Sequence, residues 1–225
     1  MPNSLKTSNP RFDARGLERH APAPVFLSRP VYARALAELA ACDRDLGRVL
    51  DRHGPPPLWA RKPGFPCLVH MILEQQVSLA SARAAFEKLR REVSPLTPAG
   101  FLSLSDGALK RAGFSRQKST YTRALARALQ TRDLVLRDVA RQPDEQAREA
   151  LVRVKGIGRW TADVYLLMAL RRPDVWPAGD LALEKALVEV KGPRDPERTA
   201  RRWRPWRSVA ARVLWHHYLR TRDRS

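Results

Sequence analysis

Apolar residues recur at helical spacing along most of this chain, the pattern of helices that each bury one face. The pattern predicts helices at 31–50, 67–78, 79–93, 117–130 and about 143–153, with short helices between 94 and 118. The segment HGPPPLWARKPGFP at 53–66 is rich in proline and glycine and is predicted to be a long loop. No segment alternates apolar and polar residues as a strand does, so the predicted fold class is all-α.

Two further predicted helices depart from the one-sided pattern. The helix 159–170 is apolar on every side, which predicts a buried central helix on which the others pack. The last helix, PWRSVAARVLWHHYLRTR, carries an apolar stripe, and Trp215 lies off this stripe when residues are placed at ~100° intervals. We therefore expect Trp215 to face something other than the packing partner of the stripe, with packing on a neighbouring helix as the alternative.

Charge indicates the kind of partner. The chain has 225 residues, 44% of them hydrophobic, which is enough for a sizeable core. Its 42 Lys and Arg outnumber 23 Asp and Glu, for a formal net charge of +19, which favours a polyanionic partner and above all nucleic acid. The uncharged apolar run VYLLMAL at 164–170 is too short to span a bilayer, so no membrane partner is expected.

The N-terminal residues and the cysteines indicate the compartment. Residues 1–30 lack periodicity and are predicted to form an irregular arm, with no apolar stretch typical of a secretion signal. Cys42 and Cys67 are expected to be free thiols in a reducing compartment, cytoplasmic or nuclear. Two cysteines cannot supply a four-cysteine iron–sulfur or zinc site.

The segment VKGIGRWTA at 154–162 combines a GxG turn with the start of a helix at about Arg159. Glycines permit the positive φ angles of a tight turn, and the free N–H groups at a helix start attract phosphate. Lys155 and Arg159 flank this turn. The interpretation is a helical hairpin that holds a phosphate, and the alternative is a helix C-cap followed by an unrelated helix.

Asp180 lies in PAGDLALEKAL, after Pro177 and Gly179 and before an apolar helical run. Aspartate is a favoured N-cap residue, so a structural role accounts for this position. A carboxylate at a helix start can also face a cleft. Asp180 is therefore a candidate for both roles.

Taken together, VKGIGRWTADVYLLMAL and the following DVWPAGD resemble the helix-hairpin-helix DNA glycosylase superfamily. Within it, ILEQQVSLASARAAF (72–86), AGFSRQKSTY (112–121) and RWRPWRSVAARVLW (202–215) resemble the 3-methyladenine DNA glycosylase II (alkylpurine) branch. The resemblance implies a two-lobed all-α fold with the active cleft between the lobes. One lobe would comprise 31–77 plus 173–225 and the other 78–172. Some relatives have an additional N-terminal β-containing domain, for which the first sixty residues here are too short.

The resemblance implies a catalytic aspartate at Asp180 and an aromatic pocket for the damaged base formed by Trp160, Trp215 and Tyr165, the last beside Val164. In branches that also cleave the strand, a lysine occupies the position of Trp160. An indole cannot act as an amine nucleophile, so a monofunctional hydrolase that leaves an abasic site is implied. No iron–sulfur cluster and no required cofactor are expected.

The resemblance also implies contacts with DNA. The residues expected to bind the DNA backbone are Lys155, Gly156, Ile157, Gly158, Arg159 and Thr161. Arg116 matches a wedge that enters the gap left by the flipped nucleotide, with a solvated loop arginine as the alternative. Gln75 and Gln76 are expected beside the cleft. Main-chain carbonyls of Val152, Val154 and Ile157 are expected to hold a monovalent cation, Na⁺ or K⁺.

The implied partner is double-stranded DNA containing damaged bases, bound by a monomer. Purines alkylated at N3 or N7 are cationic, so they leave without an elaborate general acid while a carboxylate stabilises the electron-poor sugar. Other functions stay open at this point. They are removal of oxidised, deaminated or 1-methyladenine-type bases, non-catalytic binding of damaged DNA, and regulation by a generic helix-turn-helix.

Overall fold

The computed structural model describes residues 26–222, and this range contains helices and connecting segments but no strand. The all-α prediction is therefore confirmed. None of the helices within 26–222 combines the length and the apolar character that a membrane span requires. The helices are α1 (Arg29–Cys42), α2 (Arg44–His53), α3 (Phe65–Glu74), α4 (Leu79–Glu92), α5 (Pro98–Leu102), α6 (Asp106–Arg111), α7 (Arg116–Gln130), α8 (Leu136–Val139), α9 (Asp144–Val152), α10 (Arg159–Val164), the π-helix η1 (Tyr165–Ala169), α11 (Leu181–Lys191), α12 (Pro196–Ala200), the 3₁₀ helix η2 (Arg201–Trp203) and α13 (Arg207–Arg222).

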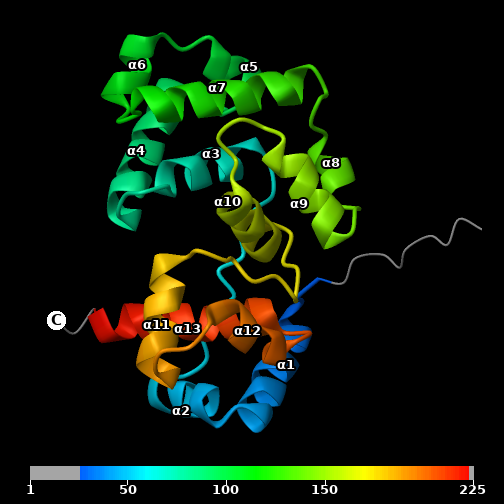
Figure 1. Ribbon diagram of the computed structural model, residues 1–225. Coiled ribbons are helices and arrows are strands. Elements are labelled where there is room, and N and C mark those ends of the chain that lie inside the picture. The colour runs from blue at the N-terminus through cyan, green and yellow to red at the C-terminus, as the bar shows by residue number, and fades with distance from the viewer. Residues whose placement is uncertain (1–25, 223–225) are drawn as a thin grey trace, which may run out of the picture.

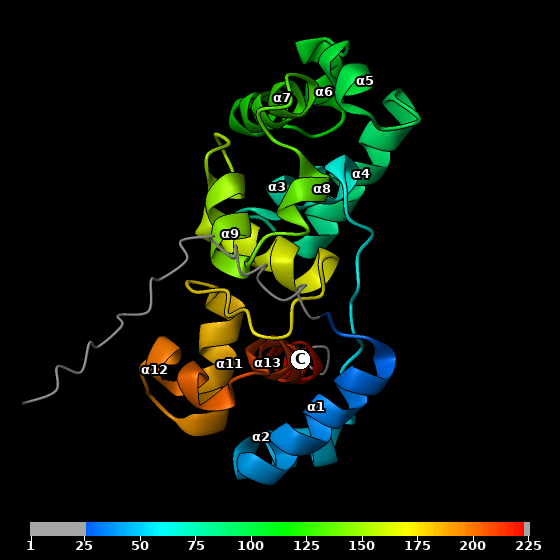
Figure 2. The same ribbon diagram turned by 90° about the vertical axis from the view of Figure 1, so that its right-hand side faces the viewer.

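The helices form two groups, which lie one above the other in Figure 1 and stay separate in the view turned by 90° (Figure 2). In the lower group α13 packs against α11, α2 and α1, and in the upper group α3 packs against α4, α7 and η1. The chain crosses upward through 54–64 and returns through 170–180. The first crossing thus precedes α3, whereas the predicted boundary between the lobes followed residue 77. The sequence does not distinguish the two positions, because the apolar residues of α3 are compatible with packing in either group. Of the predicted arm 1–30, residues 1–25 lie outside the described range.

The predicted helix 31–50 is divided into two helices at Asp43. The Oδ1 atom of Asp43 accepts the N–H groups of Asp45 and Leu46, at 3.1 and 3.3 Å, and so caps the start of α2. Its Oδ2 atom accepts the indole N–H of Trp203 at 2.8 Å, and Lys191 lies 2.8 Å from Oδ1. Partners distant in the sequence therefore stabilise a break that helical periodicity does not reveal.

Two helices form the buried centres of the groups. The predicted central helix 159–170 is buried as expected along most of its length, although its second half is the π-helix η1. In α13, all residues of 208–217 are buried. Burial thus extends beyond the predicted apolar stripe, because α1, α2 and α11 cover several sides of α13.

Arg212 of α13 joins the two groups from inside the core. Its side chain is completely buried, and burial lowers its pKa to about 10, so the guanidinium remains protonated at neutral pH. It donates to the carbonyl oxygens of Leu58 on the first crossing (2.7 Å), Leu167 in η1 (2.7 Å) and Ser208 (2.8 Å). This side chain thus fixes the lower group both to the crossing segment and to the upper group.

We expect Arg212→Met to lower the free energy of unfolding by about 3 kcal/mol or more, because three buried carbonyl groups lose a charged donor. Urea unfolding followed by circular dichroism measures this change. The control is Arg202→Met, since Arg202 is exposed, and it should change stability by less than about 0.5 kcal/mol. Equal effects of the two substitutions would contradict the role given to Arg212.

Candidate active site

A cleft of about 1730 Å³ lies between the two groups of helices. Residues of both groups line it, because the first crossing, the end of α3, the hairpin before α10 and the ends of α11 and α13 all reach it. The lining segments are 59–61, 74–79, 152–158 and 179–182, together with residues of α7, α10 and η1 and with Trp215, Tyr218 and Leu219 of α13. The position agrees with the cleft expected from the sequence.

Asp180 lies in this cleft and is also the N-cap of α11. Its Oδ1 atom accepts the backbone N–H of Leu183 at 2.8 Å and the indole N–H of Trp215 at 3.1 Å. Its Oδ2 atom accepts the indole N–H of Trp160 at 2.8 Å. Asp180 therefore caps α11 and also faces the cleft, and its catalytic role stays a prediction.

Three N–H donors and a helix N-terminus stabilise the negative charge of the Asp180 carboxylate. A carboxylate has about four lone-pair positions, so three donors leave one position open, on Oδ2. This open position can hold a water molecule or face a developing positive charge. The carboxylate is thus both fixed in orientation and available for chemistry.

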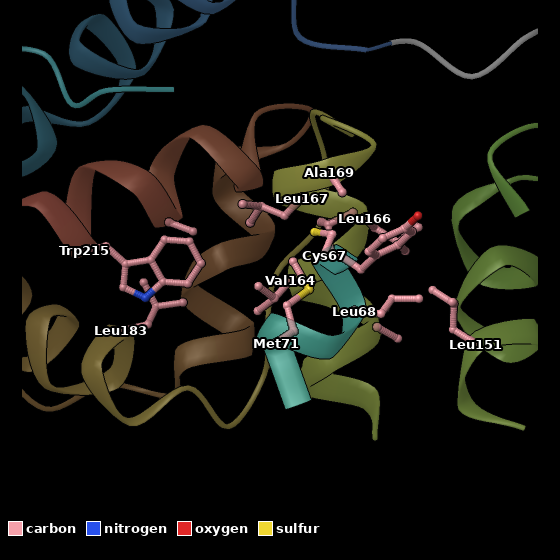
Figure 3. Close-up of a cluster of buried hydrophobic side chains, with 14 of the residues drawn as sticks. Cys67, Leu68, Met71, Leu151, Val164, Leu166, Leu167, Ala169, Leu183 and Trp215 are labelled. Atoms are coloured by element: carbon pink, nitrogen blue, oxygen red, sulfur yellow. The ribbon is translucent and has the colours of Figure 1, made fainter. Parts of the chain in front are cut away.

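Trp160 and Trp215 reach Asp180 from different groups of helices. Trp160 is the second residue of α10, and Trp215 lies in α13 with 9% of its surface exposed. Figure 3 shows Trp215 beside Leu183 at one edge of the buried cluster, with Val164 and Met71 near its middle. Both indoles line the cleft, so the aromatic walls that the sequence predicted are brought together. Sequence reasoning missed that their N–H groups hold the carboxylate.

Tyr165 does not belong to this pocket, which corrects the prediction. Its side chain is completely buried, and burial raises its pKa to about 12. Val164 lines the cleft instead. Consecutive helical residues point about 100° apart, so the neighbour of a cleft residue turns away from the cleft.

The hairpin before α10 is held by Gln75, the residue that ends α3. Its amide donates to the carbonyl oxygen of Gly156 and to the hydroxyl of Thr161, both at 3.0 Å. The side chain of Thr161 is only 1% exposed and holds the hairpin through its hydroxyl, while its predicted contact with the DNA backbone stays a prediction. Gln76 is exposed at the cleft with φ = 59°, in the left-handed region.

Three other hairpin residues that were predicted to bind the DNA backbone face outward. Lys155, Gly158 and Arg159 are exposed, whereas Ile157 is buried as the hairpin's apolar anchor. The N-cap of α10 is Gly158, and no side chain in the described structure caps this helix. Its first N–H groups are therefore open to an external acceptor.

The backbone carbonyls expected to hold a cation lie along the same turn. The side chain of Val152 is exposed, whereas the side chains of Val154 and Ile157 are buried. The carbonyl oxygen of Val154 accepts the N–H of Ile157 at 3.0 Å, which uses one of its two lone pairs. Among the described residues, no group of three or more His, Cys, Asp or Glu side chains is placed to hold a metal.

Arg116 is the first residue of α7, is exposed, and lies outside the lining of the cleft. Its neighbours Gln117, Lys118 and Tyr121 line the cleft instead. Lys118 donates to the carbonyl oxygen of Leu73 at 2.6 Å, and burial lowers the pKa of its ammonium group. Gln117, Lys118 and Tyr121 belong to the segment AGFSRQKSTY, whose resemblance could have indicated that they line the cleft.

Arg61 and Glu74 also line the cleft and form a two-pronged ion pair, with N–O distances of 2.9 and 2.7 Å. Sequence reasoning missed this pair. Arg61 lies in the loop 53–66, and nothing in the pattern of that loop indicates which element its side chain meets.

Comparison with known proteins agrees with this geometry. The family described as HhH-GPD superfamily base excision DNA repair protein matches residues 69–208. The chain is 26% identical over 159 residues to the alkylbase DNA glycosidase-like protein mag2 of Schizosaccharomyces pombe, which covers 66% of this chain and 75% of that protein.

Two solved structures have the same fold. The DNA-3-methyladenine glycosidase of Bacillus halodurans superposes with a TM-score of 0.69 at 25% identity, covering 85% of this chain and 91% of that one. The Schizosaccharomyces pombe 3-methyladenine DNA glycosylase Mag1, solved in complex with abasic DNA, gives a TM-score of 0.71 at 23% identity, covering 81% and 95%. The chain belongs to the HhH-GPD superfamily of base excision DNA repair proteins. The resemblance noted from its motifs is thereby confirmed.

The hairpin generates a prediction at Gly156, which has φ = 95° and whose added Cβ would lie 2.2 Å from Cγ of Tyr121. We expect Gly156→Ala to destabilise the protein by about 1–3 kcal/mol and to weaken binding of duplex DNA, because the hairpin must shift. Urea unfolding and fluorescence anisotropy with a labelled duplex measure the two effects.

The matched control is Gly158→Ala. Gly158 has φ = −83°, and an added Cβ there meets no atom within 4 Å. This variant should unfold nearly as the original protein does. If Gly156→Ala behaves like Gly158→Ala, the tight contact between Tyr121 and the hairpin does not determine its shape.

Proposed function

We propose that this protein is a monofunctional DNA glycosylase that removes alkylated bases, of the 3-methyladenine and 7-methylguanine type, and leaves an abasic site. The observation that carries this proposal is the Asp180 carboxylate, held in the cleft by the indole N–H groups of Trp160 and Trp215. The similarity to proteins named as an alkylbase glycosidase-like protein and a 3-methyladenine glycosidase supports the same class of substrate.

Substrate binding begins at the hairpin. The open N–H groups at the start of α10 and the exposed Lys155 and Arg159 bind phosphate groups of a duplex. A base inside a duplex cannot reach Asp180, so the damaged nucleotide must be flipped into the cleft. The faces of Trp160 and Trp215 then receive the base, and a cationic ring over an indole gains about 0.5–2 kcal/mol.

Hydrolysis of the N-glycosidic bond makes the sugar electron-poor at C1′ while the base leaves with the bonding electrons. The Asp180 carboxylate stabilises the developing positive charge, and its open position on Oδ2 orients the attacking water. An alkylated purine leaves as a neutral base, so no protonated group is needed beside it. Trp160 offers no amine, and the sugar therefore forms no Schiff base with the protein at this position.

The protein is proposed to act as a monomer, with no required cofactor, on double-stranded DNA that contains damaged bases. A Na⁺ or K⁺ ion at the carbonyls of Val152, Val154 and Ile157 would neutralise phosphate near the hairpin, and this cation remains a proposal. Arg116 is likewise proposed as the wedge, because α7 carries its exposed side chain beside the residues that line the cleft.

We expect Asp180→Asn to slow base release from methylated duplex DNA by ~10²-fold or more, because the stabilising charge is lost. Chromatography of released 3-methyladenine and 7-methylguanine measures the rate. Binding to a duplex with an abasic site and the unfolding midpoint serve as controls for folding. Equal rates of base release by Asp180→Asn and by the original protein would contradict the mechanism. If the original protein binds an abasic site tightly but releases no base, a non-catalytic binder of damaged DNA is favoured.

Trp160→Phe and Trp215→Phe each keep an aromatic face but remove a donor to the carboxylate. A hydrogen bond to a charged group contributes about 1.5–3 kcal/mol, so single-turnover release should slow by ~10-fold or more while duplex affinity changes little. The matched control is Trp206→Phe, since Trp206 donates its indole N–H to Glu38 outside the cleft. Unchanged rates in both cleft variants would mean that the indoles act through their faces alone.

A further inference from the structure

Arg61 and Glu74 form an ion pair in the wall of the cleft. Trp160, Val164 and Met168 follow one another at i, i+4 and i+8 along the helix that begins at Arg159, and all three line the cleft. The backbone N–H of Arg61 donates to the carbonyl oxygen of Met168 at 3.0 Å. Arg61 is therefore placed at the end of the helix face on which Trp160 lies.

The same loop is also fixed to the helix that carries Trp215. Arg212 of α13 donates to the carbonyl oxygen of Leu58, and the ring of Trp59 lies 6.2 Å from that of His216, centroid to centroid. The segment 58–61 thus runs between the helix of Trp160 and the helix of Trp215. Arg61 and the two indoles therefore line the same cleft, which a flipped base would enter.

The charge of Arg61 is balanced by Glu74 alone. Both oxygens of Glu74 are used by the guanidinium, and the side chain of Glu74 is only 7% exposed, against 26% for Arg61. His70 lies 3.7 Å from Glu74, but burial lowers its pKa, which favours the neutral ring. Burial raises the pKa of the nearby Cys67 thiol to about 11, so it is neutral too. The Arg61–Glu74 pair therefore has no net charge, and Lys118, which also lines the cleft, donates to the carbonyl oxygen of Leu73.

A guanidinium without its carboxylate would make this wall positive. Such a wall repels a cationic base and has little effect on a neutral one, and the low exposure of the site reduces screening by water. We propose that Glu74 makes the cleft accept cationic bases by neutralising Arg61, so that this pair determines the selectivity between cationic and neutral lesions. The inference rests on the proposed glycosylase function, because it concerns the base that enters the same cleft.

The test compares release of 7-methylguanine, which is cationic in DNA, with release of the neutral base hypoxanthine from otherwise identical duplexes. Glu74→Gln leaves Arg61 unpaired, and we expect the ratio of the two single-turnover rates to fall by ~10-fold. The double variant Arg61→Met/Glu74→Gln removes both charges and should return the ratio close to that of the original protein.

A purely structural role of Glu74 predicts a different result. Glu74 precedes Gln75, which holds the hairpin, so a displaced hairpin would slow release of both bases equally and leave the ratio unchanged. An unchanged ratio in Glu74→Gln, or the same fall in the double variant, would overturn the proposal. Thermal unfolding of each variant shows whether the fold is retained.

The proposed function and this inference can fail separately. If the original protein releases neither base, the glycosylase proposal fails, and selectivity is then measured by binding. In an Asp180→Asn background, Glu74→Gln should weaken binding to the duplex with 7-methylguanine relative to the duplex with hypoxanthine, again by ~10-fold. If every variant binds the two duplexes with equal affinity, the Arg61–Glu74 pair does not determine selectivity, and this result does not depend on whether the protein hydrolyses the bond.

Discussion

The position of the cleft depends on one buried cation, the guanidinium of Arg212. It is fully buried and bound by carbonyl oxygens of the first crossing segment, of η1 and of its own helix. A cation with several fixed acceptors can hold two groups of helices at a defined separation, because movement of either group would leave buried polar atoms unpaired. Residues of both groups line the cleft, so the separation that this contact holds also sets the distance between the two walls.

The same principle governs the cleft itself, where each charge is fixed by hydrogen bonds from a different element. Asp180 starts α11 and accepts N–H groups from α10 and α13, and Glu74 ends α3 and binds Arg61 of the first crossing. A carboxylate held in this way needs little reorganisation when positive charge develops beside it. Positive charge is exposed at the hairpin, which suits a polyanionic strand, whereas the charges of Arg61 and Glu74 balance each other in the cleft.

The two indoles connect binding with chemistry. An indole offers an apolar face and a single N–H donor at its edge, so one side chain can receive a base and fix a carboxylate together. Trp160 and Trp215 belong to different groups of helices, and both meet at Asp180. The carboxylate is therefore correctly oriented only while the two groups keep their separation.

Local patterns in the sequence determined the all-α class, most helix positions, the GxG hairpin and the helix start at Asp180, because periodicity, glycine turns and N-caps act over a few residues. Motifs in family order also indicated the superfamily. The break at Asp43, the burial of Tyr165 and of residues 208–217 of α13, the hydrogen bond from Gln75 to Thr161 and the Arg61–Glu74 pair were decided by the tertiary structure. Each depends on partners distant in the chain, and no local spacing specifies which side chains such packing brings together.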